Sequence, residues 1–147
     1  PTVTDWPDFI NRYRFDPAFR AQFVTQLTVQ EYLNQLEANV YDAWSSAIKA
    51  FDHFPHSPLE VQLFPGFAAA FYTPPTIQQD GTGSVTLTNG IYSSPSLSTT
   101  DPINYNEIIT VDKSFDSSTV FHETIPGHHH QGVMLAELAC QLATPFN

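Results

Sequence analysis

Residues 122–131 organise the chain, and they read His-Glu-Thr-Ile-Pro-Gly-His-His-His-Gln. Four of the six histidines fall in this stretch, and Glu123 directly follows the first of them. Imidazole nitrogen is a favoured zinc ligand, and a carboxylate beside a metal can act as a general base. The composition of the stretch therefore indicates a metal centre.

The spacing of the stretch differs from the familiar His-Glu-x-x-His pattern, in which one helical turn aims two histidines at a single ion. Pro126 occupies the position four residues after His122. Proline lacks an N–H and its ring clashes with the carbonyl four residues back, and Gly127 relaxes the limits on the backbone. We therefore expect a helix that enters near Ser118 to be distorted at Pro126 and Gly127.

Two candidates remain for the second histidine ligand. If Pro126 and Gly127 loop out of the helix as an insertion, His128 takes the place of the second histidine. On an unbroken helix the alternative is His129, which shares a face with His122 but lies two turns away, roughly 10 Å. Two nitrogens that bind one zinc each lie about 2 Å from it, which favours His128 over His129.

Residues 121–131 also resemble the motif of the domain-of-unknown-function 885 family, which carries His-Glu-x-x-Pro-Gly-His, often followed by a further histidine and a glutamine. The aromatic and proline residues at 71–75 and the strand-like pieces after them fit the same pattern. Members of the family look like zinc-dependent peptidases of the gluzincin type. The resemblance implies that His122 and His128 bind Zn²⁺, that Glu123 is the catalytic glutamate, and that the substrate is a peptide.

The resemblance also implies a third ligand, a glutamate on a later helix in a Glu-Gly-Trp-Ala-like stretch, and nothing in the sequence matches that stretch. Glu137 is the only carboxylate residue after Glu123, and it could serve only if the helix turned back. We therefore expect residues 1–147 to form one part of a larger zinc-peptidase-like domain. A second chain or a missing C-terminal segment would supply the glutamate ligand.

The remaining candidate residues follow from the chemistry of peptide hydrolysis. Zinc lowers the pKa of its bound water towards about 7, so that Glu123 can take the proton. Tyr92, Tyr105 and His129 are candidates to face the substrate or to stabilise an oxyanion, and His129 could instead support a ligand from behind. Adjacent residues on a helix point about 100° apart, so residues 128, 129 and 130 cannot all bind one ion.

The order of the patterns predicts an α+β fold, as in zincin-like metallopeptidases, with long N-terminal helices, a few short antiparallel strands and then a kinked helix that bears the histidines. We expect one domain with helices in 1–56, strands and loops in 57–112 and the metal-site helix in 113–147. A capping box at Thr28 and Glu31 opens the longest helix, and Asn89-Gly90 is a hairpin signal. The expected helices are a short one in 1–14 and those at 16–27, 28–51 and about 118–143. The expected strands are 60–64, 66–72, 84–88 and 105–111, with a loop rich in Ser, Thr and Pro over 93–103.

Composition limits the classes of function. The chain has 15 Asp and Glu against five Lys and Arg, a formal charge of -10, which argues against nucleic-acid binding. No apolar run is long enough to cross a membrane, and few basic residues with many Pro, Thr, Ser and Gln favour a secreted or extracytoplasmic protein. Two alternatives to a metallopeptidase stay open, namely a catalytically inactive peptidase-like module and a protein that binds metal at its surface through its histidines.

Overall fold

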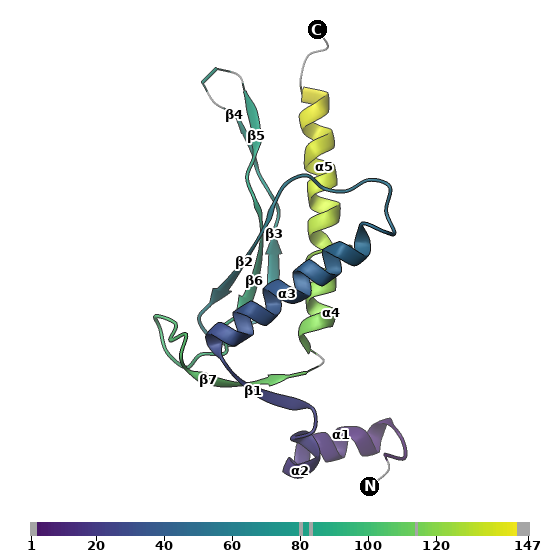
Figure 1. Ribbon diagram of the computed structural model, residues 1–147, viewed down its shortest axis with the longest axis vertical. Helices are drawn as coiled ribbons and strands as arrows, with labels where there is room; N and C mark the ends of the chain where they lie inside the picture. Colours follow the sequence, from purple (N-terminus) through teal and green to yellow (C-terminus); the bar gives the residue numbers. More distant parts are fainter. Residues whose placement is uncertain (1–2, 80, 83, 114, 144–147) are drawn as a thin grey trace.

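The computed structural model describes residues 3–79, 81–82, 84–113 and 115–143, and the fold is α+β, as the sequence predicts (Figure 1). The helices are α1 (Trp6–Phe15), α2 (Pro17–Arg20), α3 (Val29–Ala47), α4 (Phe115–Glu123) and α5 (His128–Ala143). The strands are β1 (Val24–Thr28), β2 (Leu59–Phe64), β3 (Phe71–Thr73), β4 (Ile77–Gln79), β5 (Val85–Leu87), β6 (Gly90–Pro95) and β7 (Ile108–Asp112).

Three small sheets hold the strands. The largest has the order β2-β6-β3, while β1 pairs with β7 and β4 pairs with β5. The pairing of β2 with β6 is parallel, so the expectation of antiparallel strands is wrong at this point, and the other pairs are antiparallel. Strand β6 falls partly in a segment that we expected to be a loop. Asn89-Gly90 does not form a hairpin either, because β5 and β6 belong to different sheets.

The segment before α3 is a strand and not the helix that we expected over 16–27. Helix α2 ends at Arg20, and β1 pairs antiparallel with β7 from Val24 opposite Asp112 to Thr28 opposite Ile108. The strand pairing therefore overrides the local preference for helix, which is a weak determinant on its own. Strand β1 immediately precedes α3, and β7 precedes α4.

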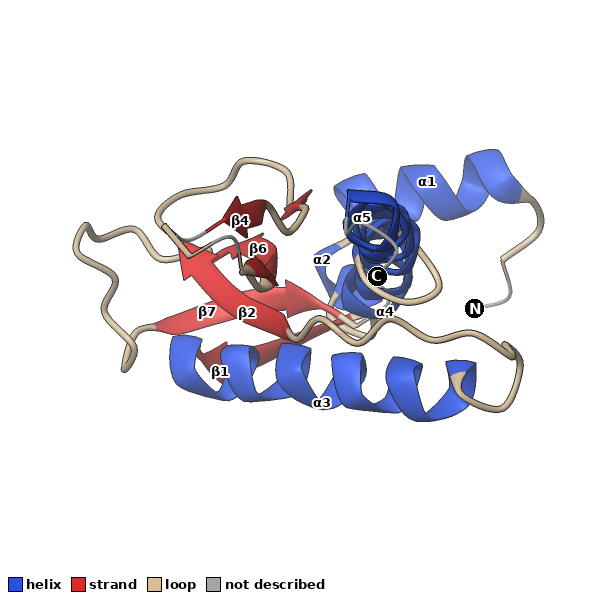
Figure 2. Ribbon diagram, turned by 90° about the horizontal axis from the view of Figure 1, so that it is seen from above, coloured by secondary structure: helices blue, strands red, loops and turns tan. Residues whose placement is uncertain are grey.

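Helix α3 begins with the predicted capping box. The Glu31 N–H donates to Thr28 Oγ1 at 3.1 Å, and the Thr28 N–H donates to the Glu31 carboxylate at 2.8 Å. The inner face of α3 then packs against β6, β7 and α4, and Figure 2 shows this helix lying along one side of the strands. The buried cluster comprises Val29, Tyr32, Leu36, Tyr92, Ile109, Val111 and Val120.

Helices α1 and α2 lie at the end of the molecule opposite the C-terminus (Figure 1). Stacked and edge-on aromatic rings of Phe9, Tyr13, Phe19 and Phe23 hold them together. The Tyr13 hydroxyl donates to Asp112 at the end of β7, which joins this helical pair to the strands. Among the described residues, no helix combines the length and the apolar character that crossing a bilayer requires.

Candidate metal centre

The helix that carries the histidines is broken where the sequence predicts. Helix α4 ends at Glu123 and α5 begins at His128, so Pro126 and Gly127 belong to neither. The Thr124 N–H still donates to the Val120 carbonyl at 2.9 Å, but the His130 N–H reaches the Thr124 carbonyl, six residues back, at 3.2 Å. At the break, a hydrogen bond between residues six positions apart therefore takes the place of the regular helical bonds between residues four apart.

Gly127 lets the chain cross very close to the last turn of α4. A Cβ atom at this position would lie 1.7 Å from the carbonyl oxygen of His122 and 2.5 Å from that of Phe121. Both contacts are with backbone, so no side-chain movement could relieve them. Only glycine fits, and the close crossing puts the start of α5 directly beside His122.

His122, Glu123 and His128 come together at this crossing. Their possible ligand atoms all lie within 4.8 Å of one another, and the two imidazole rings are 4.7 Å apart between centroids at an angle of 82°. His122 and His128 are exposed and Glu123 is half-buried. In the part of the chain that the structure describes, no other group of three His, Cys, Asp or Glu residues converges in this way.

The three side chains suit a zinc ion. Two imidazole nitrogens and one carboxylate oxygen are donor atoms that zinc accepts, and two atoms that each lie about 2.1 Å from one ion are at most about 4.2 Å apart. The ligand atoms lie within 4.8 Å of one another, and the two imidazoles are exposed and so can turn towards an ion. The chemistry of the donor set and its accessibility therefore both fit the metal.

Two shallow hollows flank His122. The hollow on the side of α5, about 520 Å³, is lined by Phe121, Pro126, Gly127, His128 and Gln131 as well as His122. The other, about 440 Å³, lies on the side of Glu123 and is lined by Ser118 and Thr119 of α4 and by Ala69 and Ala70 before β3. The cluster thus sits between two solvent-accessible hollows, which leaves room for water and for a larger molecule.

His129 does not join the cluster. Its side chain is completely buried, Nδ1 shares a 3.0 Å hydrogen bond with the Tyr72 hydroxyl, and the ring packs 5.9 Å from Trp44 between centroids. Burial lowers the pKa of His129 to about 4, against the opposing effect of the nearby Ser57 backbone. The ring is enclosed at this position and does not face solvent, and it packs α5 against Tyr72 and Trp44. The histidine that lies beside His122 is His128.

The other candidate residues lie elsewhere. Tyr92 is buried in the core, and Tyr105 is exposed in the loop before β7, where its carbonyl accepts from the Gln30 N–H. Glu137 accepts from the N–H groups of His56 and Ser57 at 2.6 and 3.2 Å, and also contacts the His56 ring. Glu137 therefore anchors the loop before β2 to α5, and it is not among the three residues of the cluster.

The sequence does not predict the residues that hold His129 or those that face Glu123. Tyr72 fits only an aromatic segment in the sequence, yet burial raises its pKa to about 12 and its hydroxyl shares a hydrogen bond with His129. Gly90 has a related role, because a Cβ there would lie 2.5 Å from His129 Nδ1 and 2.6 Å from the Tyr72 hydroxyl. Ala69 and Ala70 carry no chemical signal that could have placed them beside Glu123.

The chain belongs to the family described as "Bacterial protein of unknown function (DUF885)", whose model matches residues 1–144. This match confirms the family that the motif at residues 121–131 indicates. No curated protein and no solved structure matches the chain significantly.

Proposed function

We propose that the chain provides His122, Glu123 and His128 to a zinc-dependent hydrolase, and specifically to a metallopeptidase. The convergence of these three side chains at a break between two helices is the observation that supports the proposal. Zinc, when bound, supplies a Lewis acid that acidifies water and polarises a carbonyl oxygen. In this proposal His122 and His128 hold the ion, and each uses one ring nitrogen.

Glu123 is the general base in this proposal. It directly follows His122 at the end of α4, and its half-buried carboxylate lines the hollow bounded by Ala69 and Ala70. From there it can accept a proton from a water molecule and return that proton to the leaving amine of a cleaved peptide. The hydroxyls of Ser118 and Thr119 and the amide of Gln131 line the two hollows and are donors that could orient a substrate carbonyl.

A third protein ligand completes the proposed site. Catalytic zinc is usually held by three protein ligands, and Glu123 cannot serve fully as both ligand and base. We infer that a glutamate from a second chain, or from a segment outside the described residues, fills this position. The exposed apolar side chains Phe121, Leu135 and Leu138 on α4 and α5 would lie under such an element.

The test measures zinc content and peptide hydrolysis separately. The chain is purified together with the segment that supplies the third ligand and equilibrated with zinc. Its metal is quantified by mass spectrometry, and a mixture of fluorogenic peptides reports hydrolysis. We expect Glu123→Gln to retain zinc while hydrolysis falls by about 10²–10⁴-fold, because the amide cannot accept a proton. His122→Ala and His128→Ala should lose both zinc and hydrolysis, whereas the exposed His53→Ala serves as the matched control and should lose neither.

Two outcomes would replace the proposal. If the unmodified chain binds zinc through His122 and His128 but cuts no peptide even with its partner segment present, the chain is an inactive peptidase-like module. If His53→Ala lowers zinc binding as much as His122→Ala does, the histidines bind metal only loosely at the surface.

A further inference from the structure

A groove of about 480 Å³ lies between α3 and β2, away from the histidine cluster. Its walls are Glu37, Val40, Tyr41 and Trp44 from α3 and Leu59 and Val61 from β2. Strands β2 and β3 are the opposite edges of the three-stranded sheet, and the hollow beside Glu123 is walled by the residues that lead into β3. The groove therefore lies at the other edge of the sheet from the candidate metal centre.

The α3 wall of the groove combines a carboxylate with two aromatic rings. Glu37, Tyr41 and Trp44 follow one another at spacings of four and three residues, which puts them on one face of the helix. Tyr41 is 73% exposed, although it is a large aromatic residue, and Trp44 is half-buried with its ring 4.9 Å from Phe54. The two rings add apolar surface to that of Val40, Leu59 and Val61, Glu37 adds negative charge, and no lining residue is a Lys or Arg.

The β2 wall of the groove is the edge of a sheet. Strand β2 is hydrogen-bonded to β6 on one side, and within the described ranges no strand pairs with its other side. Leu59 and Val61 are half-buried against the core, whereas Glu60 between them is exposed on the opposite face. An edge strand presents a row of backbone N–H and C=O groups that an extended peptide can pair with.

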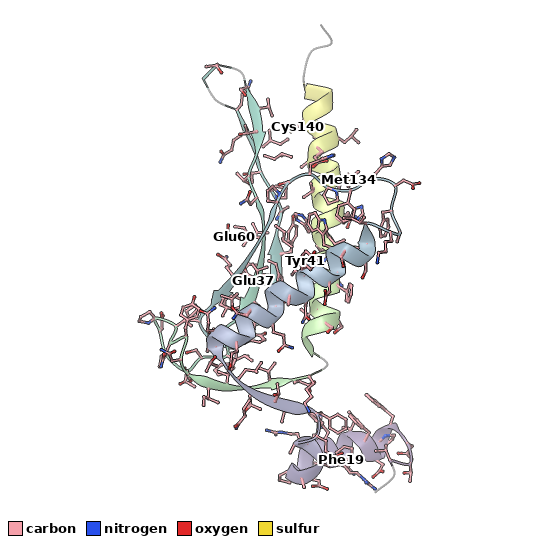
Figure 3. All side chains as sticks on the ribbon, in the orientation of Figure 1. Phe19, Glu37, Tyr41, Glu60, Met134 and Cys140 are labelled. Carbon is pink, nitrogen blue, oxygen red and sulfur yellow. The ribbon has the colours of Figure 1, made fainter. Side chains whose placement is uncertain are left out.

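A strand added to the edge of β2 would contact both α3 and β2. Because side chains alternate between the faces of a sheet, every second residue of the added strand would point towards Glu37, Tyr41 and Trp44. The others would lie on the outer face, beside Glu60. Figure 3 labels Glu37 and Tyr41 along α3 and Glu60 on β2. The two glutamates thus place negative charge on both faces of the position that such a strand would occupy.

We propose that this groove binds an extended basic segment of a partner protein, which adds to β2 as a strand. In the matching segment, aliphatic residues alternate with Lys or Arg. The aliphatic side chains point into the groove and pack on Leu59 and Val61, and the cations lie on the outer face and pair with Glu60, while Glu37 attracts them at longer range. The overall charge of -10 favours approach of a basic partner to this surface. This binding does not require the metal centre, so its success or failure is independent of the proposed hydrolysis.

The experiment uses Trp44 as the reporter. The chain has two tryptophans, and Trp6 is 71% exposed on α1, so Trp6→Phe leaves Trp44 as the only tryptophan, whose emission can be excited selectively. The probe is an acetylated and amidated heptapeptide in which lysine alternates with valine. A second peptide replaces each lysine with glutamate, and a third replaces two valines with proline, which keeps the charge but removes two backbone donors.

We expect the lysine peptide to change the Trp44 fluorescence saturably, the glutamate peptide to leave it unchanged, and the proline peptide to bind at least about tenfold more weakly. In the Trp6→Phe background, Glu60→Gln should raise the dissociation constant about two- to fivefold, as for an exposed ion pair, and Glu37→Gln should raise it by a smaller factor. Asp42→Asn is the matched control, because it removes the same charge from α3 outside the groove, and it should bind the peptide unchanged.

The proposal is wrong if the lysine peptide causes no saturable change up to about 1 mM, well above the range of specific recognition, or if the glutamate peptide binds equally well. It is also wrong if Glu37→Gln and Glu60→Gln behave like Asp42→Asn, or if the proline peptide binds with unchanged affinity, which would exclude strand addition. Circular dichroism of each variant establishes that the fold is retained.

Discussion

The rings of His122 and His128 lie 4.7 Å apart between centroids, although six positions separate the two residues in the sequence. On an uninterrupted helix, residues six apart are displaced by about 9 Å along the axis and point about 120° apart around it. The pair therefore depends on the break at residues 124–127 and not on helical periodicity. Variants of the break should affect the pair directly.

Gly127→Ala should disrupt the candidate metal centre. The added Cβ would lie 1.7 Å from the His122 carbonyl oxygen, so the backbone must move and carry His128 away from His122. We expect the free energy of unfolding to fall by about 2–3 kcal/mol and zinc affinity to fall more than tenfold, measured by denaturant titration and by competition with a chelator. Gly132→Ala is the control, since its Cβ would make only an ordinary 3.4 Å contact with Tyr72, and helical alanine should stabilise by up to about 1 kcal/mol. Equal zinc affinities in the two variants would show that the crossing at Gly127 does not position His128.

Gly90→Ala should destabilise the contact between β6 and α5. Its Cβ would lie 2.5 Å from His129 Nδ1 and 2.6 Å from the Tyr72 hydroxyl, which would break their hydrogen bond. We expect thermal and chemical denaturation to give a loss of about 1–3 kcal/mol. At Gly81 a Cβ would meet nothing within 4 Å, so Gly81→Ala should change stability by less than about 0.5 kcal/mol. If both variants were equally stable, the close approach at Gly90 would not contribute to the fold.

Glu137→Gln should weaken the fold in a way that depends on pH. Burial raises the pKa of Glu137, but hydrogen bonds from His56 and Ser57 outweigh this effect and lower it from 4.5. A lowered pKa in the folded state means that the ionised carboxylate stabilises the protein above about pH 4.5, and that this contribution is lost as the pH falls through the folded-state pKa. At pH 7 we expect Glu137→Gln to cost about 1–2 kcal/mol.

The difference between Glu137→Gln and the unmodified chain should shrink in denaturant titrations below pH 4.5. Asp52→Asn, at an exposed position before the same loop, is the control and should show no comparable difference at pH 7. A difference that stays constant from pH 7 to pH 3 would contradict the role of the Glu137 charge.

Thr28→Ala should destabilise the start of α3. The variant loses the hydroxyl that accepts from the Glu31 N–H, and such caps are worth about 1 kcal/mol. Thr28→Ser keeps the hydroxyl and should retain most of the stability in the same denaturant titration. If serine and alanine were equally destabilising, the methyl group of Thr28 and not its hydrogen bond would be responsible.

The sequence predicted features that depend on nearby residues. The capping box at Thr28 and Glu31 and the break at Pro126 and Gly127 both follow from contacts within a few positions, and both are present. The grouping of His122 with Glu123 and His128 follows from the same local geometry. Their roles in binding zinc and in hydrolysis remain predictions.

Features that depend on distant residues could not be predicted. Strand β1 was expected to be helical because its partner, β7, lies more than 80 positions later. The parallel pairing of β2 with β6 likewise joins residues about 30 positions apart. Gly90 looked like a turn residue, whereas its actual requirement is the close approach of His129 from another element.

The closeness of His122 and His128 along the chain has a consequence for the denatured state. Only five residues lie between them in the sequence, so an unfolded chain can bring the two imidazoles to one ion at a small cost in loop-closure entropy. An ion that also binds the unfolded chain stabilises the fold by less than its affinity for the folded state implies. Zinc should therefore raise the melting temperature of this chain by less than its dissociation constant suggests, and zinc should remain associated with the chain after it has unfolded.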